Sequence, residues 1–136
     1  MILSKKKKKE NLILALLYLA SQQISQHNKD IPLSLLDEMI LKFQEKCPQY
    51  PKFSYSSKPL YSQEVQAMLE NLMFWNYLYL YRTRASDDLP RIYLSLTITG
   101  EIEGKKRYDL LKDHEKRYLE EIVNSQLKQI ENDIHA

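Results

Sequence analysis

Residues 61–99 read YSQEVQAMLENLMFWNYLYLYRTRASDDLPRIYLSLTIT, and the spacing of apolar residues changes halfway along this stretch. In the first half, apolar residues recur at the three- and four-residue intervals of one helix face: Val65, Met68, Leu69, Leu72, Met73 and Trp75. From residue 77 onward, two short runs rich in Tyr, Leu, Ile and Thr predict β-strands. Residues 85–90 between them are polar and end in proline, which predicts a hairpin loop. The stretch therefore predicts a helix followed directly by a β-hairpin.

Two further helices are predicted before this stretch. Residues 6–26 carry an apolar run after a basic start, and residues 32–46 place their apolar side chains on one face. Pro48 ends the second helix because proline cannot extend a helix. The loop that follows, residues 47–59, contains three aromatic anchors, Tyr50, Phe53 and Tyr55.

Residues 101–134 predict one long helix, dense in charged residues, with a single apolar stripe. So long a stripe on so small a domain favours pairing with a second copy of the chain or with another helix. The alternative is that the helix folds back over its own domain. The predicted dimer interface consists of Leu111, Leu119, Ile122, Val123, Leu127, Ile130 and Ile134.

The composition excludes several classes of protein. The chain has 136 residues, of which 43% are hydrophobic and 28% charged, as expected for one globular domain. It contains only two glycines, so a glycine-rich nucleotide loop is not expected. The three histidines lack the spacing of a zinc site, and Cys47 has no histidine close to it in the sequence. We therefore expect no enzymatic activity, no cofactor and no metal site.

The N-terminus is similar to a signal peptide, because the lysine run of residues 5–9 precedes an apolar run at residues 12–20. However, Glu10 and Asn11 interrupt the junction, no cleavage site follows, and the apolar run is too short to span a membrane. We expect a basic N-terminal tail over residues 1–9, no membrane partner and a cytoplasmic location, with which a single cysteine is compatible.

The predicted order is three helices, a hairpin and a long helix, and with this order the chain resembles PadR-like and related winged-helix DNA-binding proteins. The resemblance rests on Leu60 and Tyr61 before the third helix, on Leu69 and Leu72 within it, and on the later step Leu96-Thr97-x-x-Gly100. The family's glycine after the third helix is replaced by Trp75-Asn76, where Asn tolerates a left-handed backbone. The resemblance implies an α+β, mostly α fold, with a winged helix-turn-helix at residues 10–99 and a dimerisation helix at residues 100–136.

In such a fold, the helix at residues 62–76 enters the major groove of DNA and the hairpin at residues 77–97 forms the wing. Gln can form paired hydrogen bonds with adenine, while hydroxyls and cations suit phosphates. The candidate DNA-binding residues are Lys58, Tyr61, Ser62, Gln63, Gln66, Arg82, Arg84 and Arg91. Ser62 is also the expected N-cap of this helix. Against DNA binding, Glu64 and Glu70 on the helix would repel phosphate.

These expectations combine into one hypothesis: a homodimeric transcriptional repressor that binds a pseudo-palindromic site in double-stranded DNA. The net charge is only +2, so any DNA-binding surface must come from the distribution of charge. Two alternatives stay open. One is a winged-helix module that binds a protein and not DNA; the other is a plasmid or viral replication or partition factor with the same DNA-binding surface.

Overall fold

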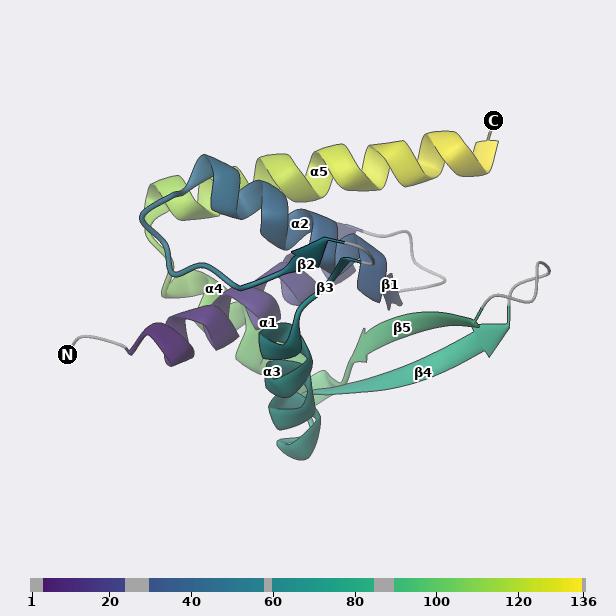
Figure 1. Cartoon of the computed structure of the whole chain (residues 1–136), viewed down its shortest axis with the longest axis horizontal. Coiled ribbons are helices and arrows are strands. Elements are labelled where there is room, and N and C mark those ends of the chain that lie inside the picture. The colour runs from purple at the N-terminus through teal and green to yellow at the C-terminus, as the bar shows by residue number, and fades with distance from the viewer. Residues whose placement is uncertain (1–3, 24–29, 58–59, 85–89, 136) are drawn as a thin grey trace.

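The computed structural model describes residues 4–23, 30–57, 60–84 and 90–135, with side chains described except at residues 83–84, 90–91 and 129–135. The described chain is α+β and mostly helical, as the sequence predicts, with five helices and small antiparallel sheets (Figure 1). In chain order the elements are α1 (Lys5–Gln23), β1 (Ile31–Pro32), α2 (Leu33–Lys46), β2 (Ser56–Ser57), β3 (Leu60–Tyr61), α3 (Gln63–Phe74), β4 (Leu78–Arg84), β5 (Pro90–Leu96), α4 (Ile98–Asp109) and α5 (Asp113–His135).

The hairpin predicted after the third helix is formed by β4 and β5. The two strands pair antiparallel along their whole length, beginning with Leu78 opposite Leu96. β1 pairs with the other edge of β5, so the order in the sheet is β1-β5-β4. The predicted tip of the hairpin, with Asp87 and Asp88, lies outside the described residues.

α1 is the central element of the core. Residues 12–17 are buried on every side of this helix, and α2, α4 and α5 all pack against it. A helix that is hydrophobic all round requires neighbours all round. Burial within the domain therefore accounts for the apolar run that is similar to a signal peptide.

The basic start of α1 is not a separate tail. α1 begins at Lys5, and the Ser4 hydroxyl accepts a hydrogen bond from the Lys7 amide at 3.1 Å. This contact satisfies one of the backbone amides that a first helical turn leaves free. The predicted tail is therefore wrong for residues 5–9, which are helical, and residues 1–3 lie outside the described part of the chain.

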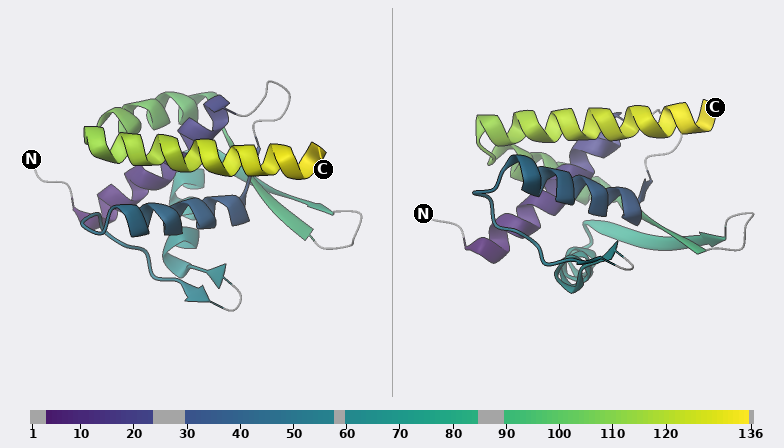
Figure 2. Two further views of the ribbon diagram at one scale, coloured as in Figure 1. Left: turned by 90° about the horizontal axis from the view of Figure 1, so that it is seen from above. Right: turned by 45° about the horizontal axis from the view of Figure 1, so that its top comes forward.

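The single long helix predicted for residues 101–134 is also wrong, because the chain breaks it into α4 and α5 at residues 110–112. α4 packs along α1, while α5 turns back over α1 and α2 (Figures 1 and 2). Five of the seven residues predicted to form a dimer interface are buried in this core: Leu111, Leu119, Ile122, Val123 and Leu127.

These five side chains cannot form a dimer interface, because their own chain already covers them. The alternative, a helix that folds back over its own domain, is therefore correct for this part of α5. Ile130 and Ile134 lie in the last turns of α5, where side chains are outside the described part.

The step Leu96-Thr97-x-x-Gly100 has a clear structural role. The Thr97 hydroxyl accepts a hydrogen bond from the Gly100 amide at 2.9 Å and donates one to the Asn76 carbonyl at 2.7 Å. A Cβ at Gly100 would lie 1.8 Å from the Tyr77 carbonyl oxygen, so the close approach of α4 to the hairpin requires glycine. Asn76 has a φ of 62°, which confirms the left-handed turn expected after the third helix.

Candidate nucleic-acid interface

The elements predicted to contact DNA lie together on one side of the molecule. α3 and the β4–β5 hairpin occupy the side opposite α5 in Figure 1, and the right-hand view of Figure 2 shows the same arrangement. α3 follows the short β2–β3 ribbon, in which Ser56 pairs with Tyr61. The packing of α5 against α1 and α2 therefore leaves the outer side of α3 uncovered.

Ser62 positions α3 and does not face a ligand. It is the N-cap of the helix, with its hydroxyl accepting a hydrogen bond from the Val65 amide at 3.2 Å, which confirms the cap predicted from the sequence. The Ser62 side chain is buried. Its assignment as a DNA-contacting residue is therefore wrong, because its hydroxyl is used inside the protein.

The outward face of α3, as the term is used below, consists of Gln63, Gln66, Ala67, Glu70 and Phe74. These residues recur at helical spacing and are exposed, apart from the half-buried Gln66. The opposite face is buried in the core through Val65, Met68, Leu69 and Leu72. The face thus begins with two glutamines near the helix N-terminus, followed by a small side chain that allows a close approach.

Glu64, which was expected to repel phosphate, is neutralised within the protein. Its carboxylate lies 2.6 Å from Lys9 Nζ and accepts a hydrogen bond from the Ser54 amide at 2.9 Å. The hydrogen bond from Lys9, followed by that from Ser54, lowers the pKa of Glu64 despite the opposing effect of desolvation. This ion pair also joins the lysine run of α1 to the first turn of α3.

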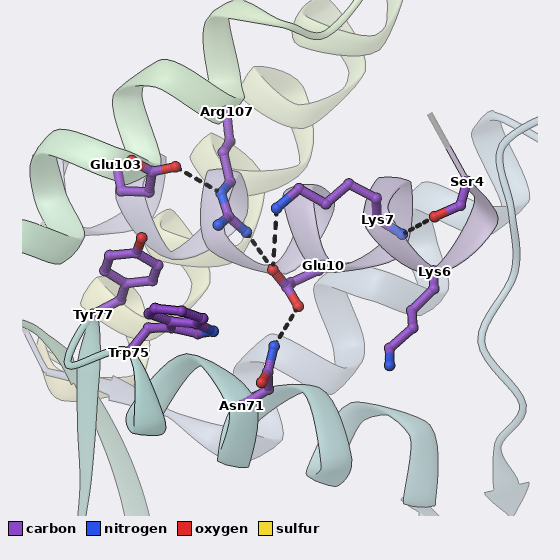
Figure 3. A pocket seen from close by; sticks show the side chains of 9 residues that line it. All are labelled: Ser4, Lys6, Lys7, Glu10, Asn71, Trp75, Tyr77, Glu103 and Arg107. Carbon is purple, nitrogen blue, oxygen red and sulfur yellow. Dashed lines mark hydrogen bonds and ion pairs between the residues drawn. The ribbon is translucent and has the colours of Figure 1, made fainter. Parts of the chain in front are cut away.

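A partly buried polar network contacts the other end of α3. Figure 3 shows the Glu10 carboxylate between Asn71 and Arg107, with which it forms hydrogen bonds of 2.8 Å each. Burial on its own raises the pKa of Glu10, but the bonds to Arg107 and Asn71 and the nearby positive charges outweigh it, so that the pKa is lowered. Asn71 therefore links α3 to α1, and Glu10 in turn links α1 to Arg107 of α4.

The same network borders an open cavity of about 420 Å³ (Figure 3). Lys6 and Lys7 line one part of it, and Trp75 and Tyr77 line another. Glu10, one of the two carboxylates that line the cavity, is already paired with Arg107. The Glu10 carboxylate is therefore not free for acid–base chemistry, and the cavity lies between the start of α1, the end of α3 and α4.

The predicted wing residues are only partly described. Arg82 is exposed on β4, close to where Tyr81 and Tyr93 stack with their ring centroids 5.6 Å apart. Arg84 and Arg91 lie in β4 and β5, but their side chains are outside the described part.

Before α3, Tyr61 is exposed on β3, while Lys58 lies outside the described residues. Tyr61, Gln63 and Gln66 thus lie at the start of α3, and their contact with DNA stays a prediction. The Tyr55 hydroxyl is not part of this group, because it donates to Asp37 at 2.8 Å.

Sequence reasoning missed the two contacts that fix α3 in place. Lys9 and Glu64 are 55 residues apart, and Glu10 and Asn71 are 61 residues apart. The spacing of residues within one helix or strand gives no information about contacts between residues so far apart in the sequence. It also missed the aromatic pair at the end of α3, where Phe74 is 81% exposed and packs edge-on against the exposed Trp75.

No protein-family model, curated protein or solved structure matches the chain. Across the described helices, none has both the length and the apolar character that crossing a membrane requires. A proposal of function therefore rests on the geometry and chemistry of the α3 side of the molecule.

Proposed function

We propose that this protein is a winged-helix protein that binds double-stranded DNA, with α3 in the major groove and the β4–β5 hairpin as the wing. The order of elements supports the proposal: three helices precede the hairpin, and β1 completes a three-stranded sheet of order β1-β5-β4. An α-helix fits the major groove of B-DNA, and residues near the N-terminus of a recognition helix reach the base edges.

The outward face of α3 is the observation that carries the proposal. Gln63 and Gln66 lie at its N-terminal end, where they suit paired hydrogen bonds with adenine. Ala67 follows, and a small apolar side chain suits contact with a thymine methyl group. Glu70 can accept a hydrogen bond from the amino group of cytosine, so its charge favours a particular base and disfavours phosphate.

Contacts with phosphate would come from around α3, since the helix itself contains no lysine or arginine. Arg82 on β4 and Tyr61 on β3, the strands that follow and precede the helix, are exposed. Such contacts position a protein on the duplex without reading the sequence. Regulators and replication or partition factors need the same surface, so the proposal covers DNA binding and leaves repression as a prediction.

A protein-binding module is the second candidate. The observation that favours it is the exposed aromatic pair at the end of α3, Phe74 and Trp75. Large exposed aromatic side chains are enriched in the central residues of protein interfaces. The acidic Glu70 on the same face is more easily accommodated by a basic protein surface than by DNA.

A titration of fluorescent random-sequence duplex at two salt concentrations distinguishes these candidates. DNA binding predicts an affinity that falls as salt rises, because each neutralised phosphate releases counterions. The plot of log K against log salt has a negative slope, and the Arg82→Ala variant should make this slope less steep by about 1, the value of one phosphate contact. The matched control is Arg117→Ala, since Arg117 is exposed on α5 at the opposite side of the molecule. No salt-dependent binding at micromolar protein would contradict the proposal and favour the protein-binding module.

A further inference from the structure

The geometry points to a binding site for a divalent transition-metal ion of the zinc type, formed by Cys47, His114 and Glu115. One ligand atom from each of these residues lies within 4.8 Å of the others. The sequence predicted no metal site, because the cysteine and the histidine are far apart along the chain. This site is separate from the α3 side of the molecule, so the inference is independent of DNA binding.

The fold brings the three ligands together at one end of two packed helices. Cys47 is the C-cap of α2, with its amide bonded to the Phe43 carbonyl at 2.8 Å. His114 and Glu115 lie in the first turn of α5, which packs on α2. The turn between α4 and α5 thus places both side chains beside the end of α2.

The donor set suits Zn²⁺ in particular. Thiolate sulfur, imidazole nitrogen and carboxylate oxygen are the three ligand types that zinc binds in proteins. One Glu115 oxygen accepts a hydrogen bond from the Lys112 amide at 2.8 Å, which orients the carboxylate and leaves its second oxygen for a metal ion. The contact resembles half of a capping box, so the local structure of α5 holds this ligand in place.

The burial of the ligands indicates how the site meets solvent. Cys47 is 5% and Glu115 is 8% exposed, whereas His114 is on the surface. With three protein ligands, a tetrahedral zinc ion bound here would keep its fourth position for water. A bound ion would offset the charge of the buried Glu115 carboxylate and link the end of α2 to the start of α5.

Cobalt is the probe of choice because the chain has a single cysteine. Co²⁺ takes the same ligands as Zn²⁺, and its charge-transfer band with thiolate can come only from Cys47. Titration of the reduced, tag-free chain should saturate this band at one Co²⁺ per chain, and added Zn²⁺ should remove it. Zn²⁺ should also raise the melting temperature of the protein.

The variants His114→Ala and Glu115→Gln test the other two ligands. Even residues that only support metal ligands are worth about 10–100-fold in affinity, so loss of a ligand should weaken Co²⁺ binding by at least about tenfold. Gln at position 115 retains an oxygen for the Lys112 amide. His135→Ala is the control for unspecific binding by a histidine on the same helix, and it should leave the affinity unchanged.

Three results would overturn the inference. They are the absence of a charge-transfer band, a band whose affinity is the same in the His114→Ala variant, and saturation at half an equivalent, which would mean an ion shared between two chains. Circular dichroism of each metal-free variant confirms folding, and the exposed His114 can be replaced without opening the core.

Discussion

Among single residues, Glu10 and Asp37 are both buried carboxylates whose surroundings shift their pKa values in opposite directions. Burial raises the pKa of Asp37 and the hydrogen bond from Tyr55 only partly offsets it. Burial also acts on Glu10, but its bonds to Arg107 and Asn71 prevail, and its pKa falls below 4.5. A lowered pKa means that the folded state favours the ionised carboxylate. Glu10 thus adds stability above pH 4.5 that is lost as the pH falls through its folded-state pKa.

Replacing Arg107 by methionine should remove this contribution and reverse its sign. The Glu10 carboxylate would stay buried with only the exposed Lys7 amine, 3.6 Å away, as a cationic partner, and removing one partner of a buried pair typically costs about 3–5 kcal/mol of unfolding free energy. The loss should be greatest near pH 7 and should shrink at acid pH, where Glu10 is protonated and uncharged in both proteins. Urea unfolding at several pH values measures it.

Glu103→Gln is the matched control, because Glu103 also pairs with Arg107, at 3.3 Å, but is partly exposed. Exposed pairs contribute about 0–1 kcal/mol, so this variant should be nearly as stable as the parent. Equal stability losses in both variants would show that the buried Glu10 carboxylate has no special dependence on Arg107.

Among the helices and strands, the junction between the hairpin and α4 shows how one short motif, Leu96-Thr97-x-x-Gly100, positions two elements relative to each other. Thr97 caps α4 and binds the turn after α3, while Gly100 lets α4 pass directly over the Tyr77 carbonyl. The sequence supported this junction through the step Leu96-Thr97-x-x-Gly100, since caps and glycines report local backbone geometry. The junction fixes where the hairpin stands relative to α4.

Gly100→Ala should therefore destabilise the protein strongly. The new Cβ meets backbone atoms, which cannot move aside as a flexible side chain would, so we expect a loss of at least about 1–3 kcal/mol. Thermal unfolding by circular dichroism measures it. Thr99→Ala, at an exposed position in the same turn, should change little. A Gly100→Ala variant as stable as the Thr99→Ala control would contradict the close packing of α4 on Tyr77.

Across the whole molecule, the sequence predicted the mostly helical α+β class and the three helices and hairpin in their order, but it missed the short strands β1, β2 and β3. The prediction failed where the structure depends on contacts between segments that are far apart in the sequence. A single apolar stripe on residues 101–134 is equally suited to a partner chain and to the chain's own core, so periodicity could not choose between them. The break at residues 110–112 contains no proline, so the sequence indicates only weakly that the helix ends there.

The same limit applies to the candidate site. Gln63 and Gln66 were identified because they lie near the start of the predicted recognition helix and because Gln can form paired hydrogen bonds with adenine. The engagement of Glu64 by Lys9, and of Asn71 by Glu10, depends on the docking of α1 against α3, which no local pattern reports. Sequence reasoning therefore found the exposed residues of α3 but not the contacts that hold it.

A substitution at Leu119 tests whether α5 is part of the hydrophobic core of its own chain. This side chain is fully buried within its own chain, so Leu119→Ala should lower the unfolding free energy by about 2–5 kcal/mol. The mass of the protein in solution, measured by light scattering, should be the same for parent and variant. A variant that keeps its stability but changes from a dimer to a monomer would restore the dimer interface predicted from the sequence.

A selection of bound sequences from random duplex shows whether the outward face of α3 recognises a DNA sequence. The parent protein should enrich a defined motif. The double variant Gln63→Ala, Gln66→Ala should lose that motif, with about 1–3 kcal/mol of discrimination lost for each paired contact, while keeping salt-dependent binding. The control variant Gln22→Ala, Gln23→Ala, which changes two exposed glutamines on α1, should enrich the same motif as the parent. No enriched motif in the parent, or the same motif in the α3 variant, would contradict recognition of DNA by the outward face of α3.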